Sequence, residues 1–350
     1  MYYIYAKRNK YIKEEFFMKT IIPEKLKKGD EIRVIAPSRS MKILGKDCIE
    51  LATKRLEEEG FKVTFAEHVM DSFDDEYNCA KIEDRVKDLE EAFKDKNVKA
   101  ILTVIGGYNS NQLLKYIDYD VIKENPKILC GYSDITALLD SIYAKTGLVT
   151  YYGPHYSSFG MKKGFEYTLE YFRKMFIEEN EEIDILPSKE WSDDAWFIDQ
   201  ENREFIKNKG YLIINEGKAE GEIVGGNLCT LNLLQGTEYM PDVENKILFL
   251  EDDGMAGNTF LMEFDRNLQS LLHTLKTVKG IVIGRAQKNC NMTDEKWIKL
   301  IKNKAELNGI PVITNVDFGH TTPICTFPIG GYAKIEAKDG KASIQIRNQK

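Results

Sequence analysis

A serine at a sharp turn is the residue of this sequence best placed to act as a nucleophile. The apolar run 127–130 ends at Gly131, and Ser133 follows directly before a helical pattern. Such a serine projects its hydroxyl from the carboxyl edge of a sheet, at a helix N-terminus whose N–H groups favour an anion. The pattern predicts a nucleophile beside an oxyanion hole. The alternative is an ordinary turn in which Ser133 or Asp134 caps the helix.

The base that would activate this serine has two candidates. A serine hydroxyl is a poor nucleophile until a base removes its proton and a third group orients that base. His320 follows the predicted strand 312–314, in a loop shaped by glycine and proline, and is the favoured base. His155 is the rival, although it lies soon after the serine's own helix and either histidine could simply occupy a loop.

The acid that would orient the base has three candidates. Glu251 directly follows the strongly apolar run 247–250. A carboxylate at a strand end can orient an imidazole and stabilise its charged form. Asp252 and Asp253 come next in the chain, and an acidic turn before a glycine is usually only solvated. The residues alone leave this choice open.

A pair of glycines is a candidate for the second part of an oxyanion hole. Gly106 and Gly107 lie at a predicted strand-to-helix turn, where glycine lets backbone N–H groups approach a ligand closely. We expect the N–H of Gly107, with Gly106 in reserve, to act together with the N–H of Asp134. The spacing matches neither the dinucleotide-binding G-x-G-x-x-G pattern nor a phosphate-binding P-loop, which counts against dinucleotide or ATP chemistry.

Three further residues are candidates for substrate binding. Asn227 opens a helix after two glycines, where it either caps that helix or directs its amide at a substrate carboxylate or carbonyl. Trp191 and Trp196 lie in the acidic, irregular stretch 178–204. They are either core residues or a lid that stacks on a ring-bearing ligand.

The candidate residues must be positioned by the fold of the chain. Its length of 350 residues predicts about two domains. Strands alternate with helices through the first half, which predicts an α/β fold with a parallel sheet covered on both faces. Ligands bind beyond the carboxyl ends of such strands. We expect an N-terminal extension (1–22, with Met18 as an alternative start), a nucleophile domain (23–177), a linker (178–209) and a C-terminal domain (210–350).

Several elements within these domains can be predicted individually. The first half includes a helix through Leu113 and Leu114. The second half includes a long amphipathic helix over about 259–275, and the chain ends in a hairpin of residues 332–337 and 342–346.

Composition narrows the class of protein. The net charge is −7, without a Lys/Arg cluster interleaved with aromatics, so a nucleic-acid polymer is not an expected partner. Six cysteines without a C-x-x-C pair and only four histidines argue against zinc and for reduced thiols. No apolar run reaches the roughly 18 residues of a membrane span, and no signal peptide is evident. We therefore expect a cytoplasmic protein with no membrane partner.

A series of motifs extends along nearly the whole chain from about residue 23. They are residues 26–38, 105–114, 131–136, 225–228, 249–252 and 319–323. Together, and in this order, they resemble the LD-carboxypeptidase family of serine peptidases.

The resemblance implies a triad of Ser133, Glu251 and His320, which resolves the choices left open above. It also implies an N-terminal domain like class I glutamine amidotransferases, a smaller C-terminal α/β domain with a barrel-like sheet, and a homodimer. The active site would lie between the domains and use no metal or cofactor.

The substrate that the resemblance implies is a small peptide or an aminoacyl-nucleotide. The Asn-Ser-Asn-Gln sequence at 109–112 and the tryptophan-bearing stretch are more similar to the microcin-immunity branch, which cleaves an aminoacyl-nucleotide amide. The murein tetrapeptide carboxypeptidase branch is the alternative. The alternative from another class is a protein that binds a small ligand without cleaving it.

Overall fold

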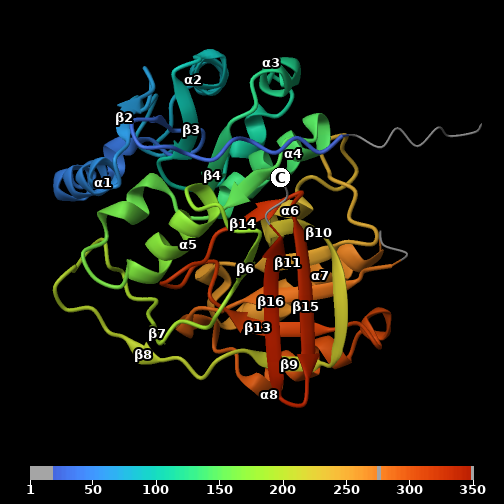
Figure 1. The fold of residues 1–350 in the computed structure, drawn as a ribbon. Coiled ribbons are helices and arrows are strands. Elements are labelled where there is room, and N and C mark those ends of the chain that lie inside the picture. The colour runs from blue at the N-terminus through green and yellow to red at the C-terminus, as the bar shows by residue number, and fades with distance from the viewer. Residues whose placement is uncertain (1–18, 274–276, 348–350) are drawn as a thin grey trace, which may run out of the picture.

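The computed structural model of the protein describes residues 19–273 and 277–347 (Figure 1). Two sheets form its frame, one in the blue-to-green part of the chain and one in the yellow-to-red part. The predicted α/β class, with a parallel N-terminal sheet and a second sheet-rich domain, is confirmed. The alternative start at Met18 lies outside the described residues, as does most of the predicted extension 1–22.

The first sheet has six strands in the order β14-β5-β4-β3-β1-β2. Five are parallel, and β14 pairs antiparallel with β5. The strands are β1 (Glu31–Ile35), β2 (Lys62–Phe65), β3 (Val98–Thr103), β4 (Ile128–Gly131), β5 (Thr150–Tyr152) and β14 (Phe327–Ile329). The helices of this half are α1 (Lys46–Glu58), α2 (Ile82–Lys94), α3 (Tyr119–Glu124), α4 (Thr136–Thr146) and α5 (Glu166–Phe176).

The second sheet has eight strands in the order β6-β16-β15-β10-β11-β12-β13-β9. Its centre, β10 to β13, is parallel, and the predicted terminal hairpin joins it as β15 and β16. The strands are β6 (Glu182–Asp184), β9 (Leu212–Asn215), β10 (Gly217–Asn227), β11 (Ile247–Glu251), β12 (Gly280–Gly284), β13 (Val312–Val316), β15 (Tyr332–Lys338) and β16 (Lys341–Arg347). The helices are α6 (Leu228–Asn232), α7 (Phe260–His273) and α8 (Asp294–Lys302), and β7 (Glu190–Trp191) pairs with β8 (Ile206–Lys207) as a separate ribbon.

The central strands β4 and β11 are apolar except for Glu251 at the end of β11, because both faces of a parallel sheet are covered. Every residue of β4 and of β11 is buried. On α7, Phe264, Leu268 and Leu271 form the buried stripe that its spacing predicts. The predicted end of that helix at Leu275 lies outside the described residues. Across the described part of the chain, no helix combines the length and apolar character needed to span a membrane.

One predicted helix is shorter than expected. The segment through Leu113 and Leu114 is only a 3-10 turn, η2 (Ser110–Leu113). The backbone N–H groups of Asn109 and Ser110 bond to the side chain of Asp134, at 3.0 and 2.9 Å. The Asp134 carboxylate thus binds N–H groups at the start of this turn, which have no partner within the turn itself.

The chain returns from the second sheet to the first just before its end. It leaves the second sheet at β13, runs through the loop 317–326 and adds β14 beside β5. In Figure 1, β14 accordingly lies among elements of the green part of the chain. The loop 317–326 is therefore attached to one sheet at each end.

Candidate active site

The serine of the site lies at a strained turn directly after β4. Tyr132 is extended, whereas Ser133 has φ of 62°, a left-handed conformation that is uncommon outside glycine. A short 3-10 turn, η3 (Ser133–Ile135), then continues into α4. Such strain persists only where the surrounding structure enforces it, and it concentrates at functional sites.

The side chain of Asp134 holds this turn in place. It accepts hydrogen bonds from the hydroxyl of Ser38 at 2.6 Å and from the backbone of Asn109 and Ser110. The Ser110 hydroxyl donates in turn to the Asp134 carbonyl at 2.6 Å. The carboxylate therefore ties together the loops that follow β1, β3 and β4.

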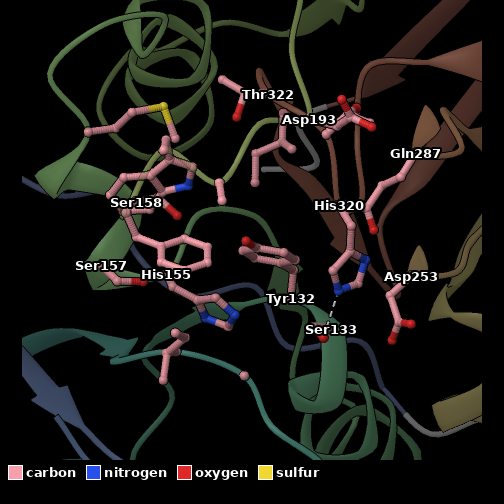
Figure 2. Close-up of a pocket in the computed structure, with 18 of the residues that line it drawn as sticks. Tyr132, Ser133, His155, Ser157, Ser158, Asp193, Asp253, Gln287, His320 and Thr322 are labelled. Atoms are coloured by element: carbon pink, nitrogen blue, oxygen red, sulfur yellow. Dashed lines mark hydrogen bonds between the residues drawn. The ribbon is translucent and has the colours of Figure 1, made fainter. Parts of the chain in front are cut away.

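The loop 317–326 brings His320 to the serine. Its Nε2 lies 2.9 Å from Ser133 Oγ (Figure 2). Its Nδ1 lies 2.7 Å from Oε2 of Glu251. In the sequence, His320 is 187 positions from Ser133 and 69 positions from Glu251. Ser133 follows a strand of the first sheet, Glu251 ends a strand of the second, and His320 lies in the loop that joins them. The geometry is that of a nucleophile, a base and an orienting acid.

Glu251 is buried, and both of its carboxylate oxygens have partners. It ends β11 directly opposite Asn227, which ends β10. Oε1 accepts hydrogen bonds from the hydroxyl of Tyr152 at 2.6 Å and from Nδ2 of Asn227 at 3.2 Å, while Oε2 faces His320. Because Tyr152 belongs to the first sheet, the acid is fixed from both sheets at once.

The other two acid candidates lie nearby but bond elsewhere. Asp252 Oδ1 accepts from Asn227 Nδ2 at 3.2 Å, and Asp253 Oδ1 accepts from the backbone of Met255 at 2.8 Å. Burial, with the charges of Glu251 and Asp253, raises the pKa of Asp252 to about 7.

The carboxylates determine the charge state of the base. Burial by itself would lower the pKa of His320, but the adjacent Glu251, with Asp253 and Asp252 farther away, raises it to about 9. The imidazolium form is thus stabilised, as a base that must carry a proton through a reaction requires.

His155, the rival base, lines the same cavity but does not contact the serine hydroxyl. Its Nδ1 lies 2.8 Å from Thr103 Oγ1, and its ring stacks on Tyr132 at 4.1 Å between centroids. Burial, together with the positive charges of His320 and Arg39, lowers its pKa well below the usual 6.5. His155 is therefore a neutral imidazole.

Both candidate oxyanion glycines line the cavity. A Cβ on Gly106 would lie 3.2 Å from Ser133 Oγ, and one on Gly107 would lie 2.2 Å from Ser38 Oγ. Within residues 19–273 and 277–347, neither backbone N–H has a hydrogen-bond partner. Gly107 thus excludes a side chain, Gly106 leaves little room for one, and the N–H groups of both are available to a ligand in the cavity.

The cavity in front of Ser133 has a volume of about 560 Å³ and is lined from both sheets and from the segment 193–197. Trp196 lines it. Trp191 does not: it lies in β7 with its ring 5.0 Å from the guanidinium carbon of Arg285 and lines a second cavity. Asn227 is also not among the lining residues, because its side chain caps α6 and bonds the two carboxylates.

Known proteins share this arrangement along the length of the chain. Residues 32–153 match the LD-carboxypeptidase N-terminal domain, and residues 220–335 match the LD-carboxypeptidase C-terminal domain. The putative carboxypeptidase YocD of Bacillus subtilis is 55% identical over 92% of this chain and 98% of its own. This chain belongs to the LD-carboxypeptidase family. The prediction of a serine-type carboxypeptidase is thereby confirmed over that of a non-catalytic binding protein.

Solved structures place this LD-carboxypeptidase near one branch of the family. An MccF-like protein of Bacillus anthracis superimposes with a TM-score of 0.92 at 58% identity, covering 94% of this chain and all of the other. The microcin C7 self-immunity protein MccF has a TM-score of 0.82 at 31% identity, over 94% and 99% of the two chains. The curated MccF of Escherichia coli is 33% identical over 90% of this chain and 93% of its own.

Two residues of the LD-carboxypeptidase site were not predicted from the sequence. Tyr152 contacts the acid, and Arg39 lines the cavity beside Gly106. Arg39 directly follows the motif 26–38 and lies beyond the carboxyl end of β1, so a cation at the end of a parallel strand was the available signal. Tyr152 ends a three-residue strand, and nothing local marks it as a partner of Glu251.

Proposed function

We propose that this LD-carboxypeptidase hydrolyses an amide bond through Ser133, His320 and Glu251. His320 takes the proton of Ser133 Oγ, and the oxygen attacks the substrate carbonyl to form a tetrahedral intermediate. His320 then protonates the leaving amine, and afterwards activates the water that releases the acyl group. The observation that carries the proposal is the pair of contacts at His320, 2.9 Å to the hydroxyl and 2.7 Å to the carboxylate.

The negative charge on the intermediate needs donors that are already in position. We propose the N–H groups of Asp134 and Gly107, with Gly106 in reserve. Support comes from the unpartnered N–H groups of both glycines and from the strained turn that precedes Asp134. Asn227 has the role of a positioning residue in this proposal, because its amide bonds the carboxylates of Glu251 and Asp252.

For the substrate, we propose an aminoacyl-nucleotide amide. Solved structures of MccF contain adenosine monophosphate, glutamyl sulfamoyl guanosine and aspartyl sulfamoyl adenosine. In this chain Trp196 lines the cavity and offers a ring on which a nucleobase can stack. A role for Trp191 in stacking stays a prediction.

A murein tetrapeptide is the second candidate substrate. It is favoured by a relative from Bacillus subtilis named as a probable murein peptide carboxypeptidase, 30% identical over 92% of this chain. Incubating the protein with muropeptide tetrapeptide and, separately, with an aminoacyl-nucleotide amide distinguishes the two, because only the true substrate class is cleaved rapidly.

Replacement of the nucleophile tests the reaction itself. Ser133→Ala should lower kcat by roughly 10⁶-fold, because the attacking atom is lost, while ligand binding persists. The change is measured by mass spectrometry of the products and by calorimetric titration of the ligand. A variant that cleaves the substrate at the rate of the original protein would refute the proposal.

Several finer expectations also remain proposals. Tyr211, just before β9, donates a hydrogen bond to the carbonyl of Ile185, just after β6, at 3.0 Å. This contact between the two edges supports a barrel-like second sheet, which an experimental structure would test. We also propose that the first domain resembles class I glutamine amidotransferases and that the two domains comprise residues 23–177 and 210–350. Finally, we propose that the protein is a cytoplasmic homodimer. Sedimentation tests the dimer, and cell fractionation tests the location.

A further inference from the structure

A positively charged side chain beside the nucleophile has no negatively charged partner. Arg39 follows β1, is half-buried, and lines the cavity that contains Ser133. Its Nε donates to the carbonyl of Gly106 at 3.2 Å. In the part of the chain that the structure describes, Arg39 forms no ion pair, and its two terminal nitrogens donate no hydrogen bond.

Two other enclosed arginines of the protein, in contrast, each pair with a carboxylate of the chain. Arg203 pairs with Asp194 at 2.6 Å, and Arg285 pairs with Asp317 at 3.0 Å. A charge taken partly out of water is costly unless a counter-charge or hydrogen-bond acceptor meets it. The Nε of Arg39 is held by the Gly106 carbonyl, whereas its two terminal nitrogens are available to an acceptor from outside the chain.

A second polar group without a partner points to the same position. His155 is 1% exposed, and its Nε2 is buried without a hydrogen bond. A Cβ on Gly106 would lie 3.4 Å from this nitrogen and 3.2 Å from Ser133 Oγ. The Thr103 hydroxyl lies 3.4 Å from the carbonyl of Cys130 as well, and when it donates instead to Nδ1, the ring carries its proton on Nε2. Nε2 of His155 and the terminal nitrogens of Arg39 thus both lack a partner among the described residues, and both side chains lie beside Gly106.

Apart from His320, the other charged side chains that line the cavity are acidic. Asp193 and Asp194 line it from the segment over the site, and Asp253 lines it near His320. Lys288 and Arg203 pair with the first two, at 3.1 and 2.6 Å. An anionic group on a substrate is repelled from Asp253 and attracted toward Gly106.

We propose that Arg39, assisted by Nε2 of His155, binds a carboxylate of the substrate, an inference that rests on the proposed amide hydrolysis. A planar guanidinium can donate two parallel hydrogen bonds to a carboxylate, a geometry that a lysine cannot reproduce. That carboxylate belongs either to the residue released at the C-terminus or to the side chain of the acyl residue. Both sources present the same group to the guanidinium.

The test compares substrates that differ only in this charge. One pair is a peptide with a free C-terminal carboxylate and the same peptide with a C-terminal amide; the other is an aspartyl and an asparaginyl nucleotide amide. We expect the original protein to prefer the charged member of one pair by about 10- to 100-fold in kcat/KM. Arg39→Gln should abolish that preference and leave the neutral member within about 3-fold, and the affected pair identifies the source of the carboxylate.

Arg266→Gln is the matched control, because it also removes an arginine charge but lies on the exposed face of α7, paired with Glu263. It should keep the full preference. The inference is overturned if Arg39→Gln retains the preference for charge, or if it slows charged and neutral substrates equally, which would mean that Arg39 only supports the Gly106 loop.

A binding measurement separates this inference from the proposed reaction. If the original protein cleaves none of the four compounds, the proposed hydrolysis fails. Calorimetry on Ser133→Ala, with and without Arg39→Gln, then compares aspartyl with asparaginyl sulfamoyl adenosine. A preference of at least about 10-fold for the aspartyl compound that disappears with Arg39 supports carboxylate binding. Equal affinities in the presence of Arg39 for this pair, together with equal affinities for the peptide acid and the peptide amide, overturn it.

Discussion

The two sides of Ser133 contain the same residue type in opposite electrostatic settings. The ring of Tyr132 lies between two histidines, 5.5 Å from His320 and 4.1 Å from His155 (Figure 2). On the side of His320 lie the carboxylates of Glu251, Asp252 and Asp253. The side of His155 has the guanidinium of Arg39 instead.

The difference shows that neighbouring charge makes the pKa values of the two imidazoles diverge. Burial disfavours the charged form of both imidazoles. Only the carboxylates reverse this effect, so the pKa of His320 rises to about 9 while the pKa of His155 falls well below 6.5. One histidine is thereby suited to accept a proton and the other to remain neutral beside a bound anion.

The largest expected effect separates the two histidines directly. His320→Ala should lower kcat by roughly 10⁴- to 10⁶-fold, because the base is lost. His155→Gln should raise KM for carboxylate-bearing substrates by roughly 10-fold, since one neutral hydrogen bond is lost or misplaced, with kcat nearly unchanged. Steady-state kinetics on both variants measures kcat and KM separately.

Thermal unfolding followed by circular dichroism should first establish that both variants are folded. If His155→Gln then lowers kcat as far as His320→Ala does, the two sides of Ser133 do not have the distinct roles assigned to them.

The next effect should come from the acid. Below its raised pKa, His320 is protonated and cannot accept the proton of Ser133, so kcat/KM should increase with pH through about 9. Glu251→Gln should lower the pKa of His320 by roughly 1–3 units, because the nearest negative charge is gone. It should also lower kcat by roughly 10⁴-fold, because the amide no longer orients the imidazole correctly.

The imidazole C–H signals of His320, followed by NMR against pH, report this pKa without relying on the residual activity. If the titration midpoint of His320 in Glu251→Gln stays near that of the original protein, Glu251 is not the cause of the raised pKa.

The smallest effect should come from Asp252. Its own pKa is raised to about 7, so it carries a charge only above that pH. Asp252→Asn should therefore move the midpoint of His320 to lower pH, by less than Glu251→Gln does, and leave kcat at high pH within about 3-fold. A pH–rate profile from 6 to 10 checks this prediction, and a shift as large as that of Glu251→Gln would contradict it.

Much of the fold could be predicted because the sequence patterns that indicate its strands and helices are local. The buried run before Ser133, the helix stripe of α4 and the alternation of strands and helices are all encoded within short windows. The helix cap at Asn227 was also predicted and is present, with its Oδ1 accepting from the backbone of Thr230 at 3.1 Å. In contrast, β14 was not predicted, because a three-residue strand has no period of its own and depends on the edge of β5.

Within the site, the sequence by itself determined the serine turn, the two glycines, and short sets of candidate bases and acids, and the family resemblance chose among them. Tertiary structure alone decided which candidates touch: His320 reaches Ser133 because its loop is attached to both sheets, and Tyr152 reaches Glu251 across them. It also turned Asn227 toward the acid and moved Trp191 away from the cavity. Among the residues that the structure describes, it left Arg39 without an ion-pair partner. The physical reason is that local periodicity fixes which face of an element is buried, whereas contacts between residues up to 187 positions apart depend on how the two sheets pack.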